Sequence, residues 1–118
     1  MALQVIYNGA VAAGKEQAPA AVTLTAPFRG VTVFMEQTMA AVAPFGCRVA
    51  YATSIDGGAT YSDWQPINHE PNPTVSGTSV NKTDILINEV ADHIKFKIQN
   101  ADGATACSTF LLQILQFA

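Results

Sequence analysis

The chain has little charge, and its basic residues do not cluster. Of its 118 residues, 13% are charged, with six lysines and arginines against nine aspartates and glutamates and a net charge of −3. Scattered basic residues cannot neutralise a run of phosphates, so we expect no nucleic-acid partner. The closest basic pair, Lys95 and Lys97, is expected to lie on a solvated strand face and to discourage edge pairing. Low charge favours a surface that is partly covered by copies of the chain or by another protein.

Targeting and membrane-spanning segments are also missing. The N-terminal stretch MALQVIYNGAVAAGKEQAPAA has neither the basic start nor the uninterrupted apolar core of a signal peptide. Apolar runs stay well below the ~18 residues that a membrane-spanning helix requires. We therefore expect a protein that is made in the cytoplasm without a signal peptide and has no membrane partner.

Cysteine is scarce, with only Cys47 and Cys107 present. The two flank Trp64 at a spacing similar to that of immunoglobulin domains, but Thr105 stands where those domains carry an aromatic residue before the second cysteine. Without export, free thiols are the preferred interpretation. The sequence leaves open whether the two cysteines meet in the fold.

The residue groupings that usually carry chemistry are absent as well. His69–Glu70 and Asp92–His93 are the only histidine–acid pairs, and two isolated histidines do not make a zinc site. The sequence contains no nucleophile elbow and no glycine-rich phosphate loop. We therefore expect no catalytic residues, no metal and no cofactor, in a protein that is not an enzyme.

What the chain does contain is apolar–polar alternation with a period of two, which predicts strands. The clearest strand covers residues 93–99, where Ile94, Phe96 and Ile98 alternate with polar residues. The other expected strands cover residues 3–7, 21–25, 30–37, 47–55, 60–67, 84–90 and 106–117.

These strands predict an all-β fold, an antiparallel two-sheet β-sandwich, in one domain covering residues 1–118. Within it, residues 1–20 would form an N-terminal arm and the first strand. The stretch 93–115 is similar to the final hairpin of immunoglobulin and fibronectin type III domains, with a tight turn of positive φ expected at Asp102–Gly103. Immunoglobulin/fibronectin-III-like topology is therefore preferred, and a jelly roll is the alternative.

The last expected strand is apolar on both faces. One face carries Phe110, Leu112 and Ile114, and the other carries Leu111, Leu115 and Phe117. A strand that is apolar on both faces is covered on both. We expect the first face to meet the core. The second face is a candidate assembly contact, unless a neighbouring loop covers it.

The most specific stretch is SIDGGATYSDW, residues 54–64. It contains the pattern S-x-D-x-G-x-T-aromatic, formed by Ser54, Asp56, Gly58, Thr60 and Tyr61. This pattern resembles the Asp-box, a β-hairpin motif of sialidases and other β-proteins. In that family the motif recurs in several propeller blades, whereas here it occurs once. The resemblance therefore implies a hairpin and not the sialidase activity.

The chemistry of the same residues favours a structural turn. An ionised Asp56 accepts hydrogen bonds from the amides that follow it, and Gly57 and Gly58 permit positive φ. Thr60 can return a hydroxyl hydrogen bond, and Tyr61 completes the turn. A calcium site using Asp56 and Asp63 is disfavoured, since calcium requires six or more oxygens.

The aromatic residues near this turn have two interpretations. Phe45, Tyr51, Tyr61 and Trp64 could fill a sandwich core, or they could form a platform for sugar. The sequence does not decide between them. If a partner or a sugar binds here, Tyr61 and Trp64 are the candidate contacts.

In overall character the chain resembles bacteriophage virion accessory proteins, with capsid decoration (cement) proteins as the nearest class. The resemblance implies a non-enzymatic structural protein of the virion. It would form dimers or trimers on the capsid surface and bridge major capsid subunits. A tail or baseplate location is equally compatible. The alternative is a carbohydrate- or receptor-binding β-sandwich module that uses Tyr61 and Trp64.

Overall fold

The computed structural model describes residues 3–24, 31–40, 46–67, 80–87 and 91–116, with the backbone alone for 80–87. The strands are β1 (Leu3–Val11), β2 (Glu16–Gln17), β3 (Val22–Thr23), β4 (Val31–Met39), β5 (Cys47–Ser54), β6 (Gln65–Pro66), β7 (Val80–Ile87), β8 (His93–Asn100) and β9 (Cys107–Gln116). Over these ranges no helix is long and apolar enough to cross a membrane.

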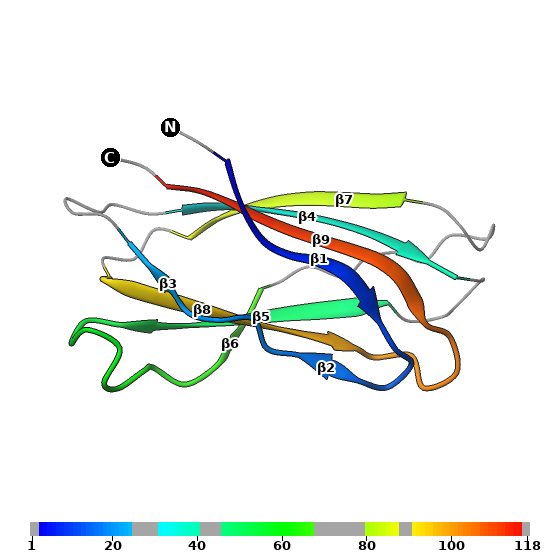
Figure 1. The fold of residues 1–118 in the computed structure, drawn as a ribbon, viewed down its shortest axis with the longest axis horizontal. Coiled ribbons are helices and arrows are strands. Elements are labelled where there is room, and N and C mark those ends of the chain that lie inside the picture. Colours follow the sequence, from blue (N-terminus) through cyan, green and yellow to red (C-terminus); the bar gives the residue numbers. More distant parts are fainter. Residues whose placement is uncertain (1–2, 25–30, 41–45, 68–79, 88–90, 117–118) are drawn as a thin grey trace.

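The strands form two layers, which Figure 1 shows one above the other. One sheet has the order β1-β9-β4-β7, and the other has the order β2-β8-β5-β6, with β3 also pairing to β8. Because β5 occupies one edge of β8, β2 and β3 follow one another along the opposite edge. Counted as one interrupted strand, they give eight strand positions in the order of a jelly roll.

The predicted all-β sandwich is confirmed, and its strand order matches the jelly-roll alternative. In an immunoglobulin-like sandwich the first strand lies beside the second. Here β1 pairs antiparallel with the last strand, and Leu3 lies opposite Leu115. Residues 1–20, for which the sequence allowed an arm, contribute β1 and β2 to the two sheets.

The predicted final hairpin is wrong. β8 and β9 belong to different sheets, and residues 101–106 cross from one layer to the other. The predicted positive φ at Asp102–Gly103 is also wrong, because neither residue is among those with positive φ. The Asp102 carboxylate instead accepts hydrogen bonds from the amides of Ala104 and Thr105, at 2.9 and 2.8 Å. A connection that spans two layers does not need the tight reversal of a hairpin.

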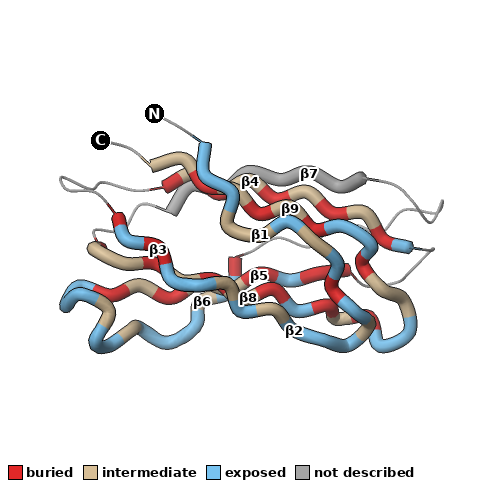
Figure 2. The backbone as a smooth tube through the Cα atoms, in the orientation of Figure 1, coloured by how far each residue is buried: buried red, intermediate tan, exposed pale blue. Residues whose placement is uncertain are grey.

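The core lies between the sheets and follows the predicted alternation. In β4 and β8, and in β9 from Phe110 to Leu115, buried residues alternate with half-buried or exposed ones, as Figure 2 shows. The largest fully buried apolar side chains are Phe96, Phe110, Ile94, Ile98, Leu112 and Ile114. Each such side chain contributes about 1.5–3 kcal/mol relative to an exposed one.

Some strand limits differ from the predicted ones. β1 continues to Val11, and the predicted strand over 60–67 shrinks to Gln65–Pro66. β5 ends at Ser54, so Ile55 is 81% exposed instead of extending the inward face. Local alternation marks strand faces well, but hydrogen bonds to neighbouring strands decide where a strand ends.

Cys47 and Cys107 are both free and fully buried. They stand on opposite sheets, and their thiols are hydrogen-bonded to each other across the core. This hydrogen bond and then burial raise the pKa of the Cys47 thiol. Cys47 is therefore held as a protonated thiol in the interior.

Candidate functional site

The turn over residues 54–60 leaves β5 and is organised around the Ser54 hydroxyl. This hydroxyl donates to Asp56 Oδ1 at 2.7 Å and accepts from the amide nitrogens of Asp56 and Gly58, at 3.3 and 2.9 Å. Ser54, the last residue of β5, is 2% exposed although it lies opposite His93 on the outward face of the strand. A buried hydroxyl with three partners closes the start of the turn.

Asp56 holds the other side of the turn. Its Oδ1 accepts from the Thr60 amide at 2.9 Å, and its Oδ2 accepts from the Thr60 hydroxyl. These hydrogen bonds from Thr60, followed by the one from Ser54, lower the pKa of Asp56 to about 2. The carboxylate is exposed, and hydrogen bonding to its ionised form causes the shift.

Two glycines supply the backbone conformation between these residues. Gly57 has φ of 75° and Gly58 has φ of 89°, both in the left-handed region. A Cβ at Gly58 would lie 3.3 Å from the Tyr61 hydroxyl and 3.7 Å from His93 Cδ2, so side chains pack closely over this glycine. A Cβ at Gly57 would meet nothing within 4 Å.

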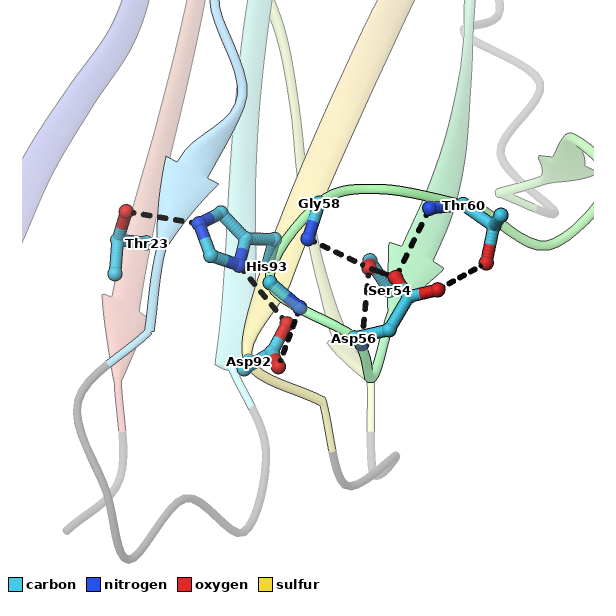
Figure 3. Close-up of polar contacts among 8 residues, drawn as sticks. Thr23, Ser54, Asp56, Gly58, Thr60, Asp92 and His93 are labelled. Carbon is cyan, nitrogen blue, oxygen red and sulfur yellow. Dashed lines mark hydrogen bonds and ion pairs between the residues drawn. The ribbon is translucent and has the colours of Figure 1, made fainter.

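A second chain of hydrogen bonds ties the turn to the rest of the sheet (Figure 3). The Gly57 amide donates to Asp92 Oδ2 at 2.9 Å, and Asp92 Oδ1 lies 2.9 Å from His93 Nδ1. His93 Nε2 lies 3.2 Å from the Thr23 hydroxyl in β3. The contacts from His93 and then the Gly57 amide lower the pKa of Asp92.

The hydrogen-bonded groups follow the order hydroxyl, imidazole and carboxylate, which is also the order of the groups in a hydrolase triad. Here the second carboxylate oxygen of Asp92 is taken by the Gly57 amide, and the chain joins β3, β8 and the turn. Its geometry therefore suits cross-linking of three segments. The expectation that the protein is not an enzyme stays a prediction.

For metal binding, the described ranges contain no group of three or more histidine, cysteine, aspartate or glutamate side chains placed around a common point. Asp56 directs its two oxygens at Ser54 and Thr60 instead. The His69–Glu70 pair lies outside the described residues.

The four aromatic residues singled out in the sequence divide between the inside and the outside. Tyr51 packs against the core, and its hydroxyl donates to Gln65 Oε1 at 3.0 Å. Trp64 is 37% exposed, and Tyr61 is half-buried. Phe45 lies outside the described residues. The structure thus brings Tyr61 and Trp64 to the surface and leaves Tyr51 inside.

Two lysines complete this surface, and for both the sequence predicts a solvent-facing position and a role in discouraging edge pairing. Lys95 Nζ lies 4.3 Å from the Tyr61 ring centroid and 4.9 Å from that of Trp64. Lys97 Nζ lies 4.8 Å from the Trp64 centroid. The predicted role of the lysines in blocking edge pairing is wrong, because β8 is an inner strand with β5 on one side and β2 and β3 on the other. The alternation of apolar and polar residues predicts both lysines on one face. It does not predict that the Tyr61 and Trp64 rings lie against them, because those residues are far away in the sequence.

The outer face of the other sheet carries several apolar side chains among polar ones such as Gln113 and Glu36. Leu3 and Val5 of β1 are 49% and 54% exposed, and Leu3 pairs with Leu115 of β9. Leu115 and Leu111 are half-buried on the face opposite to the core. Phe117, the third predicted assembly contact, lies outside the described residues. We call Leu3, Val5, Leu111 and Leu115 the apolar face.

Comparisons with known proteins bear on the fold. Neither a family model nor a curated protein matches the chain. The VP2 subviral particle of infectious bursal disease virus is similar with a TM-score of 0.58 and 10% identity, over 96% of this chain and 31% of that chain. A viral particle of the same virus gives a TM-score of 0.54 and 11% identity, over 98% of this chain and 30% of that one.

The likeness is one of fold alone. This chain spans about a third of the length of the virus-particle chains that it matches. A carbohydrate-binding module from Cellvibrio mixtus lichenase 5A is similar only at a TM-score of 0.45 and 16% identity, over 92% of this chain and 75% of that chain. The protein therefore has a β-sandwich of a kind that also occurs in a virus-particle protein.

Proposed function

We propose that the protein is a non-enzymatic structural protein of a virus particle. In this proposal it is a phage capsid decoration protein that forms dimers or trimers and bridges major capsid subunits. The observation that carries the proposal is the apolar face, with Leu3 and Val5 about half exposed and Leu111 and Leu115 half-buried on the same side of the sheet. Exposed apolar side chains gathered on one face are typical of a protein–protein contact.

The arrangement of β1 favours contact through the face of this sheet and not through its edge. β1 is an edge strand, and its pairing with β9 shifts register between Val5 and Tyr7 and again between Gly9 and Val11. Such irregularities disturb the row of free backbone groups that a further strand would need. The exposed side chains of Leu3 and Val5 are therefore the groups that remain available for contact.

The fold supports the same proposal. A jelly-roll sandwich is a frequent building block of viral shells. The likeness to the VP2 particle, at a TM-score of 0.58, is compatible with a shell role for this chain. Low charge adds to this support, since 13% charged residues leave large parts of the surface free for contact.

Static light scattering tests the assembly step. We expect a stable dimer or trimer for the unchanged chain and a monomer for the double variant Leu3→Ser and Val5→Ser. Ile55→Ser is the matched control, because Ile55 is 81% exposed on the distant turn. A chain that stays monomeric at high concentration, or a control that dissociates equally, would contradict assembly through the apolar face.

The virion location requires a separate measurement. Quantitative mass spectrometry of particles purified from the source virus should find the protein at a fixed ratio to the major shell protein. Particles that lack it should withstand heating less well, because bridging contacts add buried area between neighbouring subunits. Absence from purified particles would contradict the proposal even if the isolated protein forms oligomers.

A further inference from the structure

Tyr61, Trp64, Lys95 and Lys97 form one continuous group on the outer side of the β8–β5 sheet, which we call the aromatic–lysine surface. Lys95 touches both rings, and the two lysines share the Trp64 indole, with Nζ atoms 4.9 and 4.8 Å from its centroid. At these distances an ammonium ion is attracted to the face of an aromatic ring. The group therefore has a defined geometry.

Two features of the sequence build this surface. Lys95 and Lys97 lie opposite Ala52 and Ala50 of β5, so small side chains stand between the lysines and the loop that follows β5. Ala52 is 1% exposed although it shares the outward face, so it is covered.

The loop is also anchored beside β5. The Ser62 amide donates to the Thr53 carbonyl oxygen at 2.9 Å, and the Thr53 amide donates to Ser62 Oγ at 3.1 Å. These bonds fold residues 61–64 back along the strand and bring both rings to the lysines.

The surface concentrates positive charge on an acidic protein. Arg48 lies opposite Gln99 on the same outward face, so three of the six lysines and arginines of the chain lie here, while the net charge is −3. Two acids lie near this group: Glu16, which is half exposed and 4.0 Å from Lys97 Nζ, and Asp63, which is exposed in the loop between Tyr61 and Trp64. Two ammonium ions near one indole repel each other, and a bound anion would relieve that repulsion.

We propose that the aromatic–lysine surface binds an acidic glycan, with a sugar ring against the exposed part of Trp64 and its acidic group between Lys95 and Lys97. A carboxylate accepts charge-assisted hydrogen bonds from ammonium groups. The indole of Trp64, which is 37% exposed, supplies apolar area for the C–H face of a sugar. Nucleic acid fits less well, because it needs a longer row of basic residues than these.

This surface is independent of the assembly proposed above. The apolar face lies on the outer side of the β1-β9-β4-β7 sheet, whereas the aromatic–lysine surface lies on the outer side of the opposite sheet. Both can therefore be occupied together, and a failure of one proposal leaves the other standing.

Intrinsic fluorescence tests the proposal directly, because Trp64 is the only tryptophan of the chain. The probes are oligogalacturonate and sialyllactose, with methyl-esterified oligogalacturonate and lactose as their uncharged counterparts. We expect a saturable change with at least one acidic sugar, and binding about tenfold weaker for its uncharged counterpart, as the loss of one charge-assisted hydrogen bond would cause.

Variants locate the site. Lys95→Gln and Lys97→Gln should each weaken binding of the acidic sugar about tenfold. Lys15→Gln is the matched control, since Lys15 is exposed before β2 and outside this surface, and its affinity should stay unchanged. Thermal melting should be similar for all three variants, because these side chains lie outside the core.

Four results would overturn the proposal. The first is no fluorescence response to either acidic sugar, and the second is equal affinity for the uncharged counterparts, which would indicate ring stacking alone. The third is equal affinity for polyglutamate, which would indicate charge attraction without sugar recognition. Tighter binding of a short single-stranded oligonucleotide would assign the surface to nucleic acid instead.

Discussion

At the scale of single residues, a few side chains determine the backbone conformation of the turn over residues 54–60. Ser54 and Asp56 together satisfy four backbone or hydroxyl groups, and Asp92 holds a fifth group from outside the turn. The sequence named the residues of this turn because their chemistry is local. It did not reveal Asp92 as their partner, since that contact spans 35 positions along the chain.

Acid should weaken the turn through Asp56. Its pKa is lowered to about 2 in the folded chain, against about 3.9 in an unfolded one, so its contribution to stability is present above pH ~4 and is lost as the pH falls to ~2. Asp56→Asn should therefore lower the free energy of unfolding at neutral pH, and its difference from the unchanged chain should shrink over that interval. Urea denaturation at several pH values measures this.

The matched control for Asp56 is Asp63→Asn, which removes an exposed carboxylate from the same loop. Asp63→Asn should lower the free energy of unfolding at neutral pH much less than Asp56→Asn does. A difference for Asp56→Asn that stays constant from neutral pH to pH ~2 would show that the ionised carboxylate does not stabilise the turn.

The two positive-φ glycines should respond differently to alanine. Gly57→Ala should cost about 1–2 kcal/mol, the usual cost of a left-handed residue with a Cβ. Gly58→Ala should cost more, because its Cβ would also press on the Tyr61 hydroxyl at 3.3 Å. Gly103→Ala has open space and no positive φ, so it should change little. Chemical denaturation of the three variants measures the loss in free energy of unfolding for each. Equal losses for Gly57→Ala and Gly58→Ala would contradict the close packing over Gly58.

At the scale of elements, alternation predicted strands and faces, but not their neighbours. The inward residues of β8 and β9 could be predicted because each strand's own sequence alternates with a period of two. The sheet to which each strand belongs depends on contacts far along the chain, so residues 93–115 suggested a hairpin that does not exist. β2 was missed for a similar reason, since two residues carry no detectable period.

Adjacent leucines of β9 separate the two faces of one strand. Leu112 is fully buried, so Leu112→Ala should lower the free energy of unfolding by about 2–5 kcal/mol. Leu111 is half-buried on the outer side, and Leu111→Ala should cost clearly less in the isolated chain. Urea denaturation measures both. A larger loss for Leu111 in dilute monomer would contradict the assigned faces.

At the scale of the whole molecule, the two sheets pack against one another around one core. The reactivity of the two buried cysteines measures whether that core is closed to solvent. Cys47 and Cys107 should not react with a thiol reagent such as dithionitrobenzoate in the native state, because both are fully buried and the hydrogen bond and burial raise the pKa of Cys47. In guanidinium both thiols should titrate. Rapid labelling of the native protein would show that the sandwich opens without unfolding.

The first and last strands of the jelly roll lie side by side, with Leu3 opposite Leu115. The described chain thus enters and leaves the sandwich at one point, as Figure 1 shows at the upper left. A short linker between these ends would close the backbone into a ring, and the ring could be reopened at an exposed turn as a circular permutant with the same core. For the same reason the whole sandwich could be carried as an insert in a surface loop of a larger protein.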